Sequence, residues 1–170
     1  MSVTPEMIAG GVCALLALAI LIVLRRILRK PHHRIRRNPR RWIVVDGSNV
    51  MFWDGNEPKA ETLRRVVGYL AEQGFTAVVW FDANVGYKLS ERYRGSDWLA
   101  RQLGIPESRV LVAVKGQPAD PLVLDGARQL GARVVTNDRF RDWVDEFPEI
   151  VEPGHLVQGR LQNGQVQLEL

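Results

Sequence analysis

The sequence predicts an α/β domain in three layers, built on a parallel sheet of at least four strands. Short runs of β-branched residues alternate with segments that have the 3.6-residue period of helices, which is typical of β-α-β units. An uncharged apolar run precedes these elements, and an alternating pattern around an Asn-Gly pair follows them. The 170 residues, 46% of them hydrophobic, suffice for one globular core. A single cysteine excludes internal disulfides and zinc sites built on cysteine pairs.

The formal net charge of +4 is unevenly distributed along the chain. Residues 1–41 hold nine basic side chains and one acid, a net charge of +8. From Trp42 onward, 14 basic and 18 acidic side chains give −4. The predicted globular part is therefore acidic, and the basicity belongs to the leader.

We expect residues 1–28 to form an N-terminal transmembrane anchor. Residues 7–24 contain no charged side chain, and as a helix they would span about 27 Å, close to the thickness of a bilayer core. The basic residues follow this run instead of preceding it, which favours a retained anchor over a cleaved signal peptide. The positive-inside rule then predicts a single-pass protein of the inner or plasma membrane, with the following domain in the cytoplasm.

Residues 29–41 are predicted to be a polybasic linker. Basic side chains next to the cytoplasmic surface of a membrane are attracted to anionic head groups by about 1 kcal/mol per charge. We therefore expect residues 25–41 to contact anionic lipid. The same charges can attract nucleic acid, and the two contacts are compatible.

The globular domain is expected over residues 42–150, with strands and helices in alternation. Strands are predicted at 42–45, 76–81, 109–114 and 133–136. Helices are predicted at 58–73, 96–103 and 120–130, each closed by a glycine. Residues 151–170 are expected to form a C-terminal β-hairpin extension that covers a sheet edge or offers a contact surface.

Aspartates follow three of the four predicted strands: Asp46, Asp82 and Asp138. Asp120 begins the last helix, and Asp142 is expected one helical turn after Asp138. Any one of these acids can cap a helix or start a turn. Together, Asp46, Asp120, Asp138 and Asp142 would share one sheet edge, where a divalent cation offsets their repulsion. A donor set of oxygens alone suits Mg²⁺ or Mn²⁺.

Other phosphate-handling motifs are excluded by the same residues. No glycine-rich loop of the P-loop or dinucleotide type follows any predicted strand. The segment DGSNV at 46–50 lacks the second aspartate of haloacid dehalogenase-type enzymes and the second hydroxyl residue of a metal-dependent adhesion site. Of the phosphate-handling proteins considered, the interpretation that remains is a metal-dependent nuclease.

Three segments carry a resemblance to a known family. VVDGSNVMF at 44–52 resembles the first motif of the NYN branch of PIN-like nucleases, particularly the Zc3h12a-like ribonucleases, and VVTNDRFRDW at 134–143 resembles their last motif. Residues 118–138 are similar to the segment in which the family places one or two acids at a helix start. Asp120 occupies that position, and Ala119 stands where the family often has a second acid. The resemblance covers about 42–145.

The resemblance implies a PIN-like (NYN) fold and an endoribonuclease that cleaves single-stranded RNA with one or two Mg²⁺ or Mn²⁺ ions. Asp46, Asp120, Asp138 and Asp142 would hold the metal, and Asn49 would orient a ligand or the scissile phosphate. Side chains expected to contact single-stranded or structured RNA are Ser48, Lys88, Arg92, Arg94, Lys115 and Arg139. Turn stabilisation is the alternative role for Asn49 and Ser48, and surface solubility is the alternative for the cations.

Two functions remain open at this point. The first is a membrane-anchored, metal-dependent endoribonuclease. The second is a catalytically silent PIN-like module at the membrane that binds RNA or protein, an alternative motivated by Ala119. A DNA or flap nuclease is a further alternative within the enzyme class. An oligomer is compatible with the sequence, which does not specify one.

Overall fold

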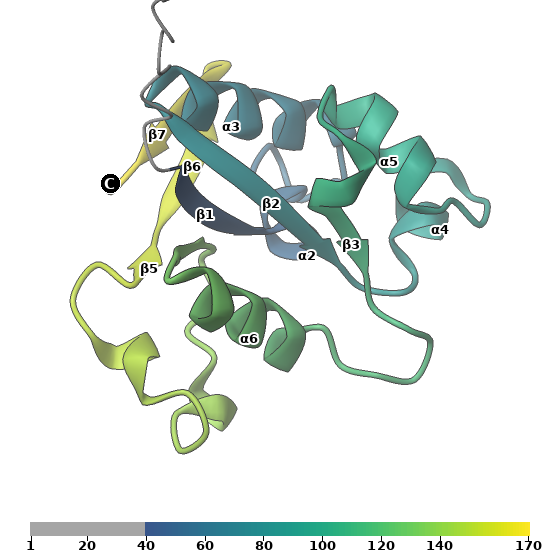
Figure 1. Ribbon diagram of the computed structural model, residues 1–170. Helices are drawn as coiled ribbons and strands as arrows, with labels where there is room; N and C mark the ends of the chain where they lie inside the picture. Colours follow the sequence, from purple (N-terminus) through teal and green to yellow (C-terminus); the bar gives the residue numbers. More distant parts are fainter. Residues whose placement is uncertain (1–39) are drawn as a thin grey trace, which may run out of the picture. The chain divides into compact units, whose positions relative to one another are not determined.

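A parallel sheet of five strands, in the order β3-β2-β1-β4-β5, organises residues 40–170, the part of the chain that the computed structural model describes (Figure 1). The expectation of at least four parallel strands is confirmed. The strands are β1 (Arg41–Asp46), β2 (Phe75–Phe81), β3 (Val110–Val112), β4 (Arg133–Val135) and β5 (Leu156–Val157).

The central strand, β1, is apolar on both faces because helices cover the sheet on both sides. Ile43 and Val45 point into one buried cluster, and Val44 points into the other. All three side chains are fully buried. This continuous apolar run is typical of the interior strand of a parallel sheet.

The longer helices lie where the sequence predicts them, and two short helices were not predicted. α3 begins at Ala60, two residues later than expected, whereas α5 and α6 match their predicted bounds. The short α2 and α4 carry too few residues for a periodic signal, so packing against the rest of the domain must stabilise them. The helices are α2 (Gly47–Val50), α3 (Ala60–Glu72), α4 (Val85–Ser90), α5 (Ser96–Leu103) and α6 (Asp120–Leu130), with 3₁₀ turns η1 (Glu107–Arg109), η2 (Arg141–Trp143) and η3 (Pro148–Val151).

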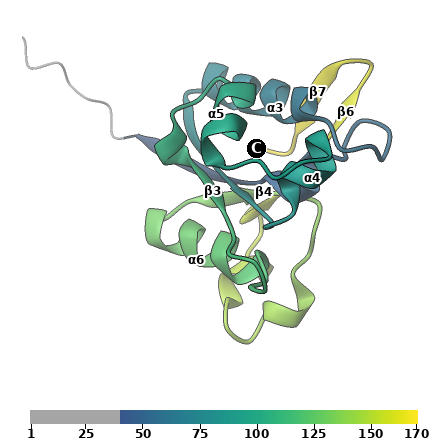
Figure 2. The same cartoon turned by 90° about the vertical axis from the view of Figure 1, so that its right-hand side faces the viewer.

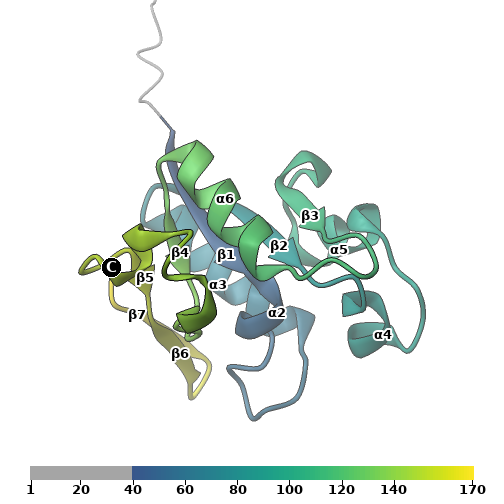
Figure 3. The same ribbon diagram turned by 90° about the horizontal axis from the view of Figure 1, so that it is seen from below.

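The two outer layers of the domain are unequal. α3 and α5 cover one face of the sheet, and α6 is the long helix on the other (Figure 2). α6 packs mainly on β1 and β4. Beside it, β3 has no helix over it on that face (Figure 3).

The C-terminal extension contains the predicted hairpin and also a strand of the main sheet. β6 (Gly159–Gln162) and β7 (Gln165–Leu168) pair in antiparallel fashion around Asn163 and Gly164, both with positive φ. The strand β5 within this extension was not predicted: Leu156 and Val157 pair with β4. Two residues are too few to show a strand period, and the burial of Val157 explains their pairing with β4.

The transmembrane anchor predicted at residues 1–28 lies outside the described residues, and so does the linker up to residue 39. Within residues 40–170, no helix combines the length and apolar character needed to cross a membrane.

Candidate active site

The carboxyl ends of β1 and β4 meet where the strand order of the sheet reverses. β2 and β3 lie on one side of β1, and β4 and β5 lie on the other. Ligands of open parallel sheets bind in the crevice at such a point. Asp46 ends β1 here, and Thr136, Asn137 and Asp138 follow β4. We call this region the acidic edge. Besides the residues at the ends of β1 and β4, it includes Asp82 after β2, Asp120 of α6 and Asp142 of η2.

Asp46 is a buried carboxylate, only 8% exposed. Its Oδ1 accepts a hydrogen bond from the backbone N–H of Asn49 (3.1 Å) and so caps α2. Its Oδ2 accepts one from the Thr136 hydroxyl (3.0 Å). Burial raises the pKa of Asp46 from 3.8 to about 6; these two bonds act against the rise, and the nearby Asp120 and Asp82 add to it.

Asp120 is the first residue of α6 and does not act as its cap. Ala119 occupies the cap position, and no side chain there bonds to the helix backbone. Burial raises the pKa of Asp120, and repulsion from Asp138, Asp82 and Asp142 adds to the shift. A hydrogen bond with Trp143 lowers it. The carboxylate is therefore free of the capping role and lies within electrostatic reach of the other acids.

Asp138 and Asp142 are connected by a tight turn, so the prediction of a helical turn between them was wrong. Asp138 Oδ1 accepts the backbone N–H of Phe140 (2.8 Å), and Phe140 adopts a positive φ of 47°. Only the short η2 follows. This turn still leaves Asp142 close enough to Asp120 to raise its pKa.

Asn49 and Ser48 brace the loop after β1, the alternative role considered for them. Asn49 Oδ1 accepts hydrogen bonds from Trp53 Nε1 (2.9 Å) and from the backbone N–H of Asn137 (3.0 Å). Ser48 Oγ accepts the backbone N–H of Asp82 (2.8 Å). These bonds tie the ends of β1, β2 and β4 together and use only the oxygen of the Asn49 amide.

Thr136 is the residue of the acidic edge that sequence reasoning missed. It is fully buried, donates to Asp46 and accepts the backbone N–H of Asp138 (3.0 Å). One hydroxyl thus positions acids from two neighbouring strands. Its place between a β-branched run and Asn137-Asp138 was the signal available in the sequence.

The predicted cations divide into two groups. Lys88 pairs with Asp82 (3.6 Å), while Arg94 bonds to Ser90 (3.2 Å) and lies over the ring of Trp98 (5.2 Å). The remaining three are exposed and form no ion pair with any residue of the described range: Arg92, Lys115 and Arg139.

A mainly apolar pocket of about 480 Å³ adjoins the acidic edge on the side of β3. It begins at Ala83 and Asn84, directly after Asp82, and Lys115 lies at its wall. Tyr87 and Tyr93 also line it and are 57% and 73% exposed. Exposed aromatic rings beside a cation are typical of surfaces that stack unpaired bases.

The donor set of the acidic edge fits a hard divalent cation. It offers only oxygen ligands, which suits Mg²⁺ or Mn²⁺. Within residues 40–170, no three Asp, Glu, His or Cys side chains are close enough to ligate one ion as they stand. Burial is the main cause of the raised pKa values of Asp46 and Asp120, and repulsion from neighbouring aspartates adds to both shifts. A cation at this edge would relieve that repulsion.

A family model matches the sequence of this chain, and solved structures match its fold. The family model described as Zc3h12a-like Ribonuclease NYN domain matches residues 39–160. No curated protein matches the sequence. The crystal structure of nuclear proteinaceous RNase P 2 (PRORP2) from A. thaliana is similar in fold, with a TM-score of 0.60 and 18% identity. A second structure, of Arabidopsis thaliana nuclear protein-only RNase P 2, is similar with a TM-score of 0.55 and 19% sequence identity. Each match covers 100% of this chain and 37% of the other, and such low identities show the fold alone.

Without metal, we expect the free energy of unfolding to fall as the pH rises from about 4 to 6. The folded pKa of Asp46, about 6, lies above 3.8, so the folded state keeps a proton that the unfolded state loses in this window. The loss is on the order of 2 kcal/mol. Asp46→Asn should lose less stability over the same window in urea denaturation of the metal-free, full-length protein.

Asp125→Asn is the matched control, because Asp125 is an exposed carboxylate on α6. It should follow the wild-type pH dependence. Equal pH dependence of wild type and Asp46→Asn would contradict the assignment of a raised pKa to Asp46.

Proposed function

Because the chain belongs to the Zc3h12a-like ribonuclease NYN domain family, we propose that it is a metal-dependent endoribonuclease that cleaves single-stranded RNA. The observation that carries this proposal is the convergence of carboxylates from three parts of the chain on the acidic edge. Asp46 ends β1, Asp120 begins α6, and Asp138 follows β4. The burial of Asp46 despite its charge supports a role beyond capping α2.

In this proposal Asp46, Asp120, Asp138 and Asp142 hold one or two Mg²⁺ or Mn²⁺ ions. When bound, such an ion activates water and stabilises the charge that develops on the scissile phosphate. Thr136 and the backbone N–H of Asn49 keep the Asp46 carboxylate in one orientation. The Asn49 side chain uses its oxygen to brace the loop, and its NH₂ group is left to donate to a phosphate oxygen.

The pocket of Tyr87 and Tyr93 supports the single-stranded substrate class. A base can stack on an exposed tyrosine only when it is not stacked and paired within a duplex. Lys115 at the same wall is positioned to neutralise the accompanying phosphate. The pocket begins directly after Asp82, so a strand held there lies next to the acidic edge.

One observation favours the second candidate, a catalytically silent PIN-like module that binds RNA or protein. Ala119 stands directly before Asp120, where the family often has an acid, and its side chain is buried. The site then has one carboxylate fewer for a second ion. RNA binding that persists in EDTA, without cleavage, would support this candidate.

The main test is metal-dependent cleavage of single-stranded RNA by the full-length protein. We expect Mn²⁺ or Mg²⁺ to support cleavage and EDTA to abolish it. Asp120→Asn and Asp138→Asn should each lower the rate roughly a hundredfold or more, because each removes a proposed ligand. Asp125→Asn on the same helix as Asp120 should cleave at the wild-type rate. If the folded wild-type protein leaves the RNA intact when metal is supplied, the proposal is wrong.

The tyrosine pocket can be tested separately by steady-state kinetics on single-stranded RNA. Replacing Tyr87 or Tyr93 by alanine should raise KM roughly fivefold to a hundredfold, since stacking contributes about 1–3 kcal/mol per base, while kcat stays near the wild-type value. The matched variants Tyr87→Phe and Tyr93→Phe keep the ring and should keep the wild-type KM. An unchanged KM in both alanine variants would show that the bases do not stack there.

We also propose that residues 7–24 anchor the protein in a membrane with residues 40–170 in the cytoplasm. The support is the uncharged apolar run followed by basic residues. The full-length protein should sediment with membranes and resist extraction by high salt. Leu16→Arg with Leu18→Arg should release it, because each arginine costs about 3 kcal/mol at the centre of a bilayer. Wild-type protein in the soluble fraction would contradict the anchor.

A further inference from the structure

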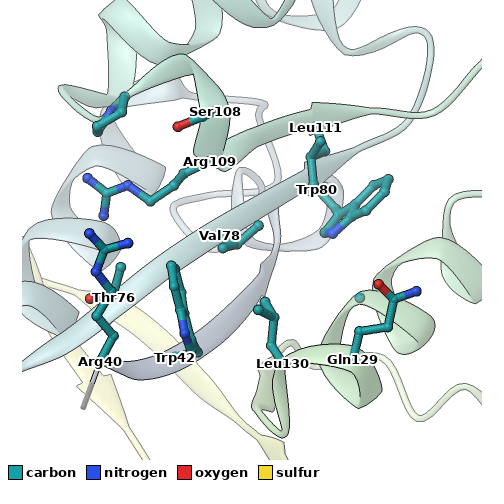
Figure 4. Close-up of a pocket in the computed structure, with 12 residues that line it drawn as sticks. Arg40, Trp42, Thr76, Val78, Trp80, Ser108, Arg109, Leu111, Gln129 and Leu130 are labelled. Carbon is teal, nitrogen blue, oxygen red and sulfur yellow. The ribbon is translucent and has the colours of Figure 1, made fainter.

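A cleft of about 720 Å³ opens on the α6 face of the sheet, over β2 and β3 (Figure 4). It exists because α6 packs on β1 and β4 and leaves the neighbouring strands open on that side. Cavities of this size are typical of small-molecule sites. None of the carboxylates of the acidic edge lines it.

The floor of this cleft is apolar and partly aromatic. Val78 and Trp80 are two residues apart on β2 and therefore project from the same face of the sheet. Trp42 of β1 and Leu111 of β3 line the cleft beside them. In Figure 4 these side chains lie along the strands, and Leu130 and Gln129 of α6 line the same cleft. Flat rings and branched aliphatic side chains form a surface that suits a planar, apolar group.

Gly126 lets α6 lie close to this floor. A Cβ atom at this position would come within 2.8 Å of Trp80 Nε1. The Trp80 N–H is buried and has no hydrogen-bond partner among residues 40–170. Among the described residues the indole is therefore held by packing, including the close approach of Gly126.

Two arginines line one end of the cleft, Arg40 and Arg109. The hydroxyl-bearing side chains of Thr76 and Ser108 lie at the same end (Figure 4). Arg40 lies over the ring of Trp42 at 5.4 Å. No carboxylate lines the cleft, and neither arginine forms an ion pair with a residue of the described range.

This pair of cations contrasts with the charge of the rest of the domain. Residues 40–170 hold 16 basic and 18 acidic side chains, a net charge of −2. Guanidinium groups without a carboxylate partner, next to hydroxyls, are suited to bind phosphate oxygens in a bidentate manner. The charge also disfavours the basic linker before Arg40 as the occupant, since like charges repel.

We propose that this cleft binds a nucleotide, with the phosphate on Arg40 and Arg109 and the base on the floor between Trp42 and Trp80. An acidic peptide would satisfy the arginines and leave the aromatic floor bare, whereas a nucleotide satisfies both. The nucleotide is either free or part of an RNA strand, which share this chemistry. The site is separate from the acidic edge and does not depend on the cleavage proposed there.

The test is calorimetric titration of the full-length protein with AMP, in EDTA so that no metal recruits the phosphate to the acidic edge. AMP should bind more tightly than adenosine, ribose 5-phosphate or inorganic phosphate. Arg40→Gln and Arg109→Gln should each weaken binding roughly tenfold, the loss of one charge-assisted hydrogen bond. Arg64→Gln, on α3 across the sheet, makes the same change of charge and should bind AMP like the wild type.

A single-stranded RNA hexamer separates the two sources. Arginine-dependent binding of AMP identifies a free nucleotide, and arginine-dependent binding of the hexamer alone identifies a nucleotide within RNA; both support the proposal. Affinities for AMP and hexamer that do not change in the arginine variants would overturn it. So would measurable AMP binding that is no tighter than that of ribose 5-phosphate, no binding of either AMP or the hexamer, or arginine dependence seen only with phosphatidylserine vesicles. Asp120→Asn should bind AMP like the wild type, so failure of the cleavage proposal remains distinguishable.

Discussion

The hydrogen bonds that hold the buried Asp46 carboxylate are the constraint on which the rest of this domain depends. A carboxylate at the buried end of the central strand is costly to bury unless it is hydrogen-bonded. The Asn49 N–H and the Thr136 hydroxyl meet this need from α2 and from the end of β4, 90 residues further along the chain. The same Thr136 hydroxyl fixes Asp138, so one small network sets the geometry of the acidic edge.

The unequal layers of the domain give its two halves different chemistry. α6 brings Asp120 to the acidic edge and covers β1 and β4, which leaves β2 and β3 open on the same face of the sheet as a basic, aromatic cleft. β2 belongs to both regions, since Trp80 lines the cleft and Asp82 lies two residues further on. The −4 charge of the chain after Trp42 is thus an average of an acidic edge and local basic surfaces.

Elements with a long periodic signal could be predicted from the sequence, and contacts between distant residues could not. β1 to β4, α5 and α6 follow from apolar patterns and closing glycines, and so does the gathering of Asp46, Asp120 and Asp138 at one edge. α2, α4 and β5 are too short for a pattern. Thr136 and the braces made by Ser48 and Asn49 join residues 34 to 90 positions apart, which no local pattern encodes. The prediction that Asp142 follows Asp138 by one helical turn failed because Phe140 adopts a positive φ and forms a tight turn.

Ala119 illustrates the conflict between the number of carboxylates at the acidic edge and the repulsion between their charges. It occupies the cap position of α6, is 5% exposed and adjoins Asp120, whose pKa is already raised by burial and by three neighbouring acids. A carboxylate at this position would gain little as a cap, because Ala119 has helical backbone angles (φ −79°, ψ −29°) and a capping residue is typically extended. It would also add a buried negative charge beside Asp120, and that charge is tolerated only with a cation or a proton. Alanine avoids this buried charge and so favours the fold without metal, and in the metal-binding role proposed for the acidic edge it would leave fewer ligands for a second ion.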